Sequence, residues 1–301
     1  MDEKSETEGK VIRKSGRMTD KMIRKRGSKR TLREDWHETS DGGRVLLLRY
    51  PLLEDTGLVE HCFTTRIGGV SEGIFSSMNL SFTRGDEKGA VETNFRRLSE
   101  ALCVDYKKFV LSDQTHTVNV RKVTAADAGK GLFRERDYTD VDGLITNEPG
   151  LVLSTFFADC VPLYFVDPVH RAIGMSHSGW RGTVARMGAV TLRAMEREYG
   201  TRPEDVICAI GPSICQDCYE VSGDVAQAFR SEFEGNEVKI LRESPKNRAN
   251  MTDEEKKYQL DLWKANEIVL LEAGVLPAHL AVTDICTCCN PVVFWRCPYS
   301  G

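Results

Sequence analysis

Three side chains that can bind metal each follow an apolar run typical of a buried strand. Cys160 and His177 each end such a run, and His116 closely follows another. Two imidazoles and one thiolate form a zinc ligand set that leaves a fourth position for water or substrate, as in catalytic sites. The alternative is that Cys160 is a small buried hydrophobic residue and that the histidines are hydrogen-bonded loop residues. The spacing alone leaves both interpretations open.

Two glycine-rich turns carry an arginine that could bind an anion. Arg66 lies in Thr65-Arg66-Ile67-Gly68-Gly69, and Arg181 lies in Gly179-Trp180-Arg181-Gly182, just before a predicted helix. Glycine lets a backbone approach a ligand closely, and the planar guanidinium matches phosphate or carboxylate. Free backbone N–H groups at a helix start favour the same anions. Phosphate binding by Arg181 is therefore a hypothesis, and a structural salt bridge to a core carboxylate is its alternative.

Two further pairs of cysteines have the internal spacing of zinc-ribbon ligands. They are Cys215-x-x-Cys218 and Cys286-x-x-Cys289. The gap between the pairs is wider than in the usual ribbon, although distant pairs can meet in three dimensions. We expect buried structural thiols at these positions, with a zinc site as the alternative.

The elements that would position these residues follow from the hydrophobic pattern. Apolar runs predict strands at Phe109–Leu111, Val118–Val123, Gly143–Thr146, Leu151–Phe156, Val161–Val166 and Ile173–Ser176. Apolar residues three or four apart predict helices around 91–102, 185–195, 225–233 and 262–269, with Gly200 and Gly274 closing the second and the last. We therefore predict an α+β fold, a single domain with mixed β-sheets in the middle flanked by helices.

The composition indicates a soluble, cytoplasmic protein. The 301 residues are 41% hydrophobic, but no apolar run is long enough to span a bilayer and no signal peptide is evident. The ten cysteines are then expected to be thiols or metal ligands, because the cytosol keeps thiols reduced. The net charge of −4 gives no sign of nucleic-acid binding by the whole chain. We expect no association with membranes.

The first forty residues are rich in basic side chains and are expected to form a basic arm. From Lys10 to Arg33 there are eleven Lys or Arg residues against one acid, Asp20. This stretch has few apolar residues and no steady period, so we predict a disordered arm over 1–40, with order beginning near Val45 in a domain spanning 45–301. A weak role in nucleic-acid binding is the alternative to a solvated tail that catalysis does not need.

Read in order, several motifs resemble the laccase-domain (YfiH-type) family, formerly described as polyphenol oxidases. They span roughly 58–294 and are Thr65–Gly73, Met78-Asn79-Leu80, Gln114-Thr115-His116, Ala158-Asp159-Cys160-Val161-Pro162, His177–Gly182, Ile210-Gly211-Pro212, Cys218-Tyr219-Glu220-Val221 and Cys286-Thr287. The resemblance implies a zinc-dependent purine nucleoside enzyme. Such an enzyme phosphorolyses adenosine, inosine and S-methyl-5′-thioadenosine to the free base and (methylthio)ribose 1-phosphate, and it also deaminates adenosine.

The resemblance implies that His116, Cys160 and His177 are the metal ligands, with Zn²⁺ rather than copper as the ion. It also implies that purine nucleosides and phosphate are the substrates. Arg66, Asn79 and Arg181 are expected to bind substrate, and Arg181 to take part in catalysis. Asp159, next to Cys160, is the nearest carboxylate that could transfer protons during deamination. The oligomeric state stays open.

One departure from the family pattern concerns the end of the chain. The family continues past the Cys286 motif with an arginine-rich tail and a further strand, whereas this sequence ends Phe294-Trp295-Arg296-Cys297-Pro298-Tyr299-Ser300-Gly301. We expect a shortened C-terminus that leaves a sheet edge or pocket wall open. Three alternative functions remain: a metal-free Cys–His hydrolase, a polyphenol oxidase (laccase) and a catalytically impaired binding protein.

Overall fold

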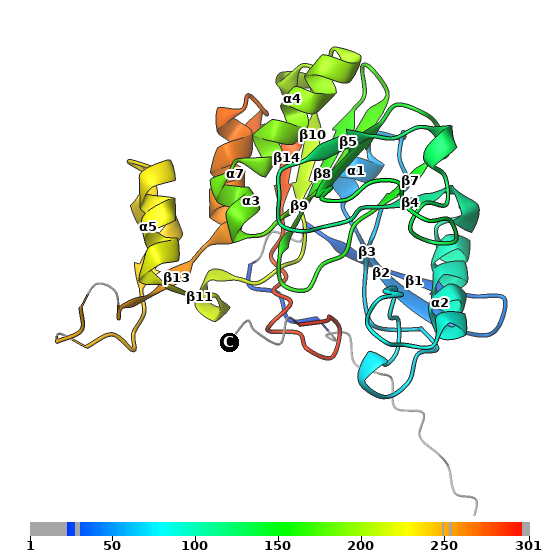
Figure 1. Ribbon diagram of the computed structural model, residues 1–301, viewed down its shortest axis with the longest axis horizontal. Coiled ribbons are helices and arrows are strands. Elements are labelled where there is room, and N and C mark those ends of the chain that lie inside the picture. The colour runs from blue at the N-terminus through cyan, green and yellow to red at the C-terminus, as the bar shows by residue number, and fades with distance from the viewer. Residues whose placement is uncertain (1–22, 28–30, 249, 253–254, 297–301) are drawn as a thin grey trace, which may run out of the picture.

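A six-stranded mixed sheet organises the computed structural model, which describes residues 23–27, 31–248, 250–252 and 255–296 (Figure 1). In sheet order its strands are β14 (Leu280–Val282), β10 (Ile207–Ile210), β8 (Val161–Asp167), β9 (Ala172–Ser178), β6 (Gly143–Thr146) and β5 (Val120–Lys122). The two outer pairs, β14–β10 and β6–β5, are parallel, and the inner pairs are antiparallel.

Smaller sheets and several helices surround this sheet. The small sheets are β1-β2-β3 (Arg33–Glu38, Arg44–Arg49, Phe63–Thr64), β11-β13-β12 (Glu220–Ser222, Lys257–Leu260, Leu241–Glu243) and β4-β7 (Phe109–Leu111, Val152–Ser154). The helices are α1 (Pro51–Glu54), α2 (Lys88–Ala101), α3 (Trp180–Val184), α4 (Met187–Tyr199), α5 (Gly223–Glu232), α6 (Glu237–Ile240) and α7 (Leu262–Glu272). The predicted α+β fold with mixed sheets between helices is confirmed.

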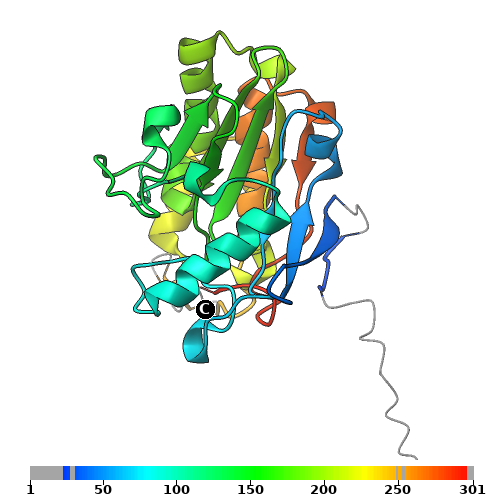
Figure 2. The same cartoon turned by 90° about the vertical axis from the view of Figure 1, so that its right-hand side faces the viewer.

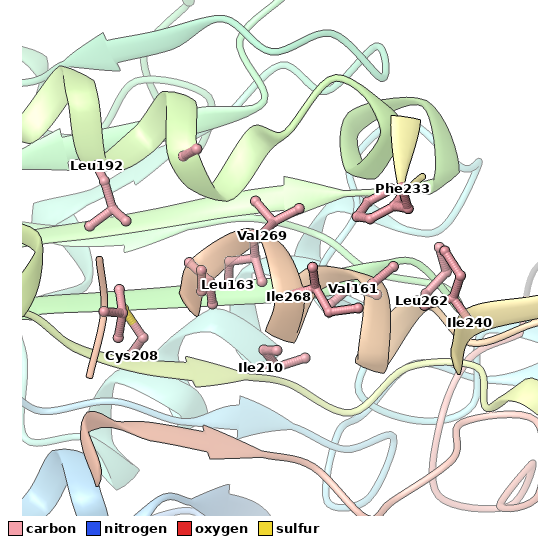
Figure 3. Packing of buried hydrophobic residues seen from close by; sticks show 14 of the residues in the cluster. Val161, Leu163, Leu192, Cys208, Ile210, Phe233, Ile240, Leu262, Ile268 and Val269 are labelled. Carbon is pink, nitrogen blue, oxygen red and sulfur yellow. The ribbon is translucent and has the colours of Figure 1, made fainter. Parts of the chain in front are cut away.

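Both faces of β8 are buried, which explains its nearly continuous apolar sequence. Leu163 and Phe165 face one side, where α4 and α7 supply Leu192, Val269 and other core residues (Figure 3). The alternate residues Tyr164 and Val166 belong to a second core, which includes residues of β2 and α1. Successive side chains of a strand point to opposite faces, so one strand serves two cores. This packing on both faces holds the start of β8 rigidly, and Cys160 directly precedes it.

A third core lies between β2 and α2. Val45 and Leu47 of β2 pack with Val91, Phe95 and Leu98, which lie three or four residues apart on α2. The helix α2 lies alongside the small sheet that contains β2 (Figure 2). The spacing places these residues on one face of the helix. The same core includes Phe109 and Leu111 of β4, so it supports the strand that leads into the His116 loop.

The predicted helix around 185–195 is interrupted at its start. Arg186 adopts a left-handed conformation with φ 58°, so α3 ends at Val184 and α4 begins at Met187. The Arg186 guanidinium forms ion pairs with Glu232 and Glu272, which hold the bend. Gly200 ends α4 with φ 77°, as predicted. The short helix α3 gives Arg181 a position separate from the body of α4.

The folded domain begins earlier in the chain than the predicted boundary at 45. The strand β1 pairs along its whole length with β2. Asp35 on β1 forms a salt bridge of 2.5 Å with Arg49, whose side chain is only 7% exposed. Charged residues can join a strand when their charges are paired, and a search for apolar periodicity misses such a strand. Ile23 and Leu32 are also buried. Residues 1–22 of the predicted arm lie outside the described residues.

Candidate metal centre

The paired strands β8 and β9 bring two predicted metal ligands together. Pro162 on β8 pairs with His177 on β9, so Cys160, just before β8, lies beside the end of β9. His116 comes from the loop between β4 and β5. The ligand atoms of His116, Cys160 and His177 all lie within 4.8 Å of one another. The structure thus brings together all three residues that the sequence suggested as ligands.

The spacing of these ligand atoms suits a metal ion between them. The Cys160 Sγ lies 3.9 Å from the His116 Nε2, and the rings of His116 and His177 lie edge to face with centroids 4.9 Å apart. A tetrahedral zinc ion about 2.3 Å from sulfur and about 2.0 Å from nitrogen would separate those two ligand atoms by about 3.5 Å. The site could therefore hold such an ion after a small adjustment of side chains.

A buried carboxylate, Asp142, orients His177. The Asp142 Oδ1 lies 2.7 Å from the His177 Nδ1, and the Asp142 side chain is fully buried. In the tautomer that satisfies this contact, Nδ1 carries the proton and donates a hydrogen bond to the carboxylate, which leaves Nε2 free to bind a metal. Burial by itself raises the pKa of Asp142, but hydrogen bonds from His177 and two backbone N–H groups outweigh it and lower the pKa to about 2. Asp142 is therefore an anion at neutral pH.

The same carboxylate fixes the backbone that carries His116. The N–H groups of Thr115, His116 and Thr117 donate hydrogen bonds to Asp142 over 3.0, 3.2 and 3.0 Å. They stabilise a left-handed conformation at His116, with φ 66°, which is uncommon outside glycine. Burial lowers the pKa of His116, and the neighbouring His177 lowers it further. The neutral imidazole, which is the form that binds metals, is thereby favoured.

Gly179 leaves the space that the three ligands need. A Cβ at this position would lie 3.1 Å from the Cys160 Sγ and 3.1 Å from the His116 Cδ2. Those contacts are tight enough to displace one of the ligands. The metal centre therefore explains why a glycine follows β9: any side chain there would crowd the ligands.

A large cavity of about 1400 Å³ reaches the three ligands. Its walls combine polar groups with many apolar and aromatic side chains, among them Phe82, Phe156, Phe157 and Trp295. Such a cavity can enclose a small organic molecule beside the metal-binding atoms. Trp295 and Arg296 contribute to the wall near the end of the chain, and residues 297–301 lie outside the described residues.

Arg181 lies on α3 with an exposed side chain, and it is not among the residues that line the cavity. Its positive charge is one of the smaller influences that lower the pKa of His116, after burial and His177. The guanidinium lies 4.4 Å above the ring of Trp180. Within the described residues it forms no salt bridge, so the structural role considered as the alternative has no partner there.

Asp159 is adjacent to Cys160 but faces a different neighbour. Its side chain is buried, its backbone has φ 76°, and its Oδ1 accepts a 2.5 Å hydrogen bond from the Thr287 hydroxyl. Asp159 does not line the cavity that reaches the ligands. The contact links the segment before β8 to the segment that follows β14.

The other two predicted substrate-binding residues make structural contacts. The Arg66 guanidinium donates to the backbone carbonyls of Ser76 and Pro291 and stacks on Trp295, with its carbon 4.0 Å from the ring centroid. Asn79 lines the cavity, but its Nδ2 donates to the Ser81 carbonyl and to Asp86. Arg66 is not among the residues that line the cavity.

The sequence interpretation missed Asp142, although a signal for it exists. Asp142 directly precedes the predicted strand Gly143–Thr146, and Gly143 pairs with Ser176, next to His177. Knowing that β6 and β9 are neighbours would have identified Asp142 as a partner of His177. Strand order is the missing information, because it is not encoded in local apolar patterns.

Comparisons with known proteins agree with this architecture. The family model for multi-copper polyphenol oxidoreductase laccase matches residues 60–296. The purine nucleoside phosphorylase YlmD of Bacillus subtilis is 34% identical over 266 residues, covering 87% of this chain and 86% of that protein. The adenosine deaminase RL5 from an unknown prokaryotic organism is 33% identical over 248 residues, covering 81% and 89%. The crystal structure of YfiH from Bacillus licheniformis superposes with a TM-score of 0.71 and 34% identity, covering 78% of this chain and 85% of that one.

Among the described residues, no helix is both long enough and apolar enough to cross a bilayer. The family model covers most of the chain, and relatives above 30% identity extend over more than four fifths of it. The chain therefore belongs to the family described as multi-copper polyphenol oxidoreductase laccase, which is the laccase-domain family that its motifs resemble.

Proposed function

We propose that this protein is a zinc-dependent purine nucleoside enzyme. Its main reaction is phosphorolysis of adenosine, inosine and S-methyl-5′-thioadenosine, in which phosphate attacks the ribose C1′, the base leaves, and (methylthio)ribose 1-phosphate forms. Its second reaction is the deamination of adenosine, in which water replaces the amino group to give inosine and ammonia. Two relatives that cover most of the chain are named for these two activities.

The single observation that carries the proposal is the convergence of His116, Cys160 and His177 at a large cavity. Three ligands are the number that a catalytic zinc site uses, because the fourth position is left for water or substrate. When bound, zinc supplies a Lewis acid that polarises oxygen and lowers the pKa of water to about 7. Asp142 orients the His177 ring by accepting a hydrogen bond from its Nδ1.

Arg181 is proposed to bind phosphate. Its exposed guanidinium lies close enough to His116 to lower the pKa of that imidazole. A planar guanidinium can hold two phosphate oxygens at once and so orient the anion for attack. The aromatic walls of the cavity offer stacking surfaces for a purine base.

Asp159 is proposed to transfer protons in deamination, although its bond to Thr287 points to a positioning role for the segment that carries Cys160. Asp159→Asn, compared with Thr287→Val, which removes the hydroxyl donor, distinguishes these two roles. A positioning role requires that Thr287→Val and Asp159→Asn weaken metal binding alike. A proton-transfer role requires that Asp159→Asn depress deamination with metal content unchanged.

The family's descriptive name raises a multi-copper oxidase as a competing function. A multi-copper centre needs many clustered histidines, and the chain has six. In the described part of the chain only His116 and His177 join a group of possible metal ligands. His61 accepts a hydrogen bond from the Tyr50 backbone, and His170 pairs with Asp167. The arrangement of histidines favours the nucleoside enzyme.

The test is to incubate protein of known metal content with adenosine or inosine, with and without phosphate, and to identify the products by chromatography. We expect free base and ribose 1-phosphate only with phosphate, inosine from adenosine without it, and loss of both after chelation. Turnover that survives complete chelation would support the metal-free Cys–His hydrolase instead. Oxidation of phenols with no nucleoside turnover would support the oxidase, and no turnover at all would support the impaired binding protein.

A further inference from the structure

Four cysteines outside the metal centre come together from two distant parts of the chain. Cys215 and Cys218 flank the turn before β11, and Cys286 and Cys289 lie in the segment that follows β14 (Figure 1). Their sulfur atoms all lie within 4.8 Å of one another. The sequence left open whether these pairs were separate buried thiols or one zinc site, and the structure shows that they share one location.

We propose that Cys215, Cys218, Cys286 and Cys289 form a second, structural zinc site. Four sulfur atoms about 2.3 Å from a tetrahedral zinc ion lie about 3.8 Å from one another. The Sγ atoms of Cys218 and Cys289 are 3.5 Å apart, close to this value and far beyond a disulfide bond. A cluster of four irons would need the sulfur atoms further apart, because each binds a different iron. The spacing therefore favours a single ion.

The surroundings supply the hydrogen bonds that a zinc–thiolate site requires. The Cys215 N–H donates to the Cys286 Sγ over 3.3 Å, and the Arg26 guanidinium donates to the Cys289 Sγ over 3.3 Å. Four thiolates around one Zn²⁺ carry a net charge of −2, which Arg26 partly offsets. Arg26 is itself held by an ion pair with Asp217, inside the first cysteine pair. Donors to the sulfur atoms and an oriented cation are outer contacts that stabilise bound metal.

The degree of burial indicates a structural site. Cys215 and Cys286 are buried, Cys218 and Cys289 are half-buried, and none of the four lines the cavity that reaches His116. Four protein ligands fill the coordination of zinc and leave no position for substrate. The site therefore shares no ligand with the metal centre and has a different task.

That task is to hold together the two cysteine pairs and the N-terminal segment around Arg26, next to the segment that carries Cys160. Thr287, within the second cysteine pair, donates to Asp159, and the Ile214 N–H, beside the first pair, donates to the Asp159 carbonyl. The Arg26 N–H donates to the Asp284 carbonyl and ties the N-terminal segment to the same place. A bound zinc ion would lock these segments around Asp159, the residue before the ligand Cys160.

Metal content measured on the full chain tests the proposal. We expect two zinc equivalents in the wild-type protein. Cys218→Ser/Cys289→Ser should lose one equivalent and unfold at a lower temperature, whereas the matched control Cys103→Ser, at an exposed cysteine outside both groups, should keep two. His116→Ala/His177→Ala should retain the equivalent at the four cysteines. Retention of all zinc by Cys218→Ser/Cys289→Ser would overturn the proposal, whatever the outcome for the metal centre.

Alkylation of the native protein gives a second test that needs no variant. Labelled peptides identified by mass spectrometry should show Cys218 and Cys289 protected until a strong zinc chelator is added, and Cys103 labelled throughout. Equal labelling with and without chelator, or a Cys218–Cys289 disulfide in freshly purified protein, would overturn the proposal. Cys288, the neighbour of Cys289, checks the assignment: Cys288→Ser should keep both equivalents, and loss of one would assign a ligand role to Cys288 in place of Cys289.

Discussion

The His177 Nδ1 and the Asp142 Oδ1 lie 2.7 Å apart in the interior of the protein, with both side chains buried. The same carboxylate accepts the backbone N–H groups of Thr115, His116 and Thr117. One anion therefore fixes the ring orientation of one candidate ligand and the backbone of another. Asp142 is a positioning residue, because it acts through the ligands.

Replacing this carboxylate should weaken metal binding without removing a ligand. We expect Asp142→Asn to reduce zinc affinity at the metal centre by about 10–100-fold. The amide is neutral and has only one acceptor oxygen, so it cannot replace all the hydrogen bonds of the carboxylate. Competition with a chromogenic chelator measures the affinity. Asp140→Asn is the matched control, since Asp140 bonds to the Thr115 hydroxyl on the exposed side of the same loop. Equal affinities for Asp142→Asn and the wild type would refute this role.

The space at Gly179 predicts a steric effect on the same centre. In Gly179→Ala the new methyl group would approach the Cys160 Sγ and the His116 Cδ2 to 3.1 Å, so we expect lower zinc occupancy and activity with the fold retained. Gly182→Ala is the control, because the nearest atom to its new Cβ is 3.5 Å away. Circular dichroism and metal analysis of both variants separate a local effect from unfolding. Full zinc occupancy in Gly179→Ala would show that the ligands can adjust freely.

The proposed phosphate role of Arg181 predicts a difference between the two reactions. Arg181→Ala should raise the phosphate requirement or depress phosphorolysis by about 1.5–3 kcal/mol, the range for a hydrogen bond to a charged group. Phosphate-independent deamination should fall much less, and zinc content should stay unchanged. Arg181→Lys should recover only part of the loss, because an ammonium lacks the paired donors of a guanidinium. Equal losses in both reactions would place Arg181 on the nucleoside or in the scaffold.

Local patterns in the sequence were sufficient for much of the central sheet and its helices. Gly143–Thr146 is a strand with the predicted bounds, and the runs at 161–166 and 173–176 are strands extended by one to three residues. These runs are apolar because both faces of the sheet are covered. A strand buried on both faces is recognisable in the sequence as a nearly continuous apolar run. The three ligand candidates were recognised because Cys and His at strand ends are chemically distinctive.

Features that depend on contacts between distant segments could not be predicted in this way. Asp142 acquires its role only when β6 lies beside β9, and the four cysteines meet only when the segment after β14 passes the turn before β11. The strand β1 is another example, because it is polar and is held by ion pairs with β2. In each case the sequence supplies the residues, and the arrangement of strands decides which residues meet.

The strand β1 predicts a pH-dependent stability. Burial raises the pKa of Asp35, but hydrogen bonds from His37, Arg33 and Arg49 outweigh it and lower the pKa from 3.8 to about 2. A lowered pKa in the folded state stabilises the protein above the unfolded-state pKa, and this contribution is lost as the pH falls towards 2.

We therefore expect Asp35→Asn to lower the free energy of unfolding by about 1–3 kcal/mol at pH 7, and the difference from the wild type to narrow between about pH 4 and pH 2. Denaturant unfolding at several pH values measures it. Glu34→Gln, at an exposed position on the same strand, is the control and should change little. A pH-independent difference would mean that the charge of Asp35 is not the stabilising feature.

The most direct test of the central claim is a paired measurement of zinc content and adenosine phosphorolysis in Cys160→Ala. We expect the loss of one zinc equivalent together with a fall in turnover of at least about 100-fold, since even outer partners of metal ligands change affinity or activity by about 10–100-fold. Circular dichroism and the zinc equivalent at the other four cysteines report whether the fold is kept. A Cys160→Ala protein with wild-type zinc content and wild-type turnover would contradict the claim that His116, Cys160 and His177 form the catalytic metal centre.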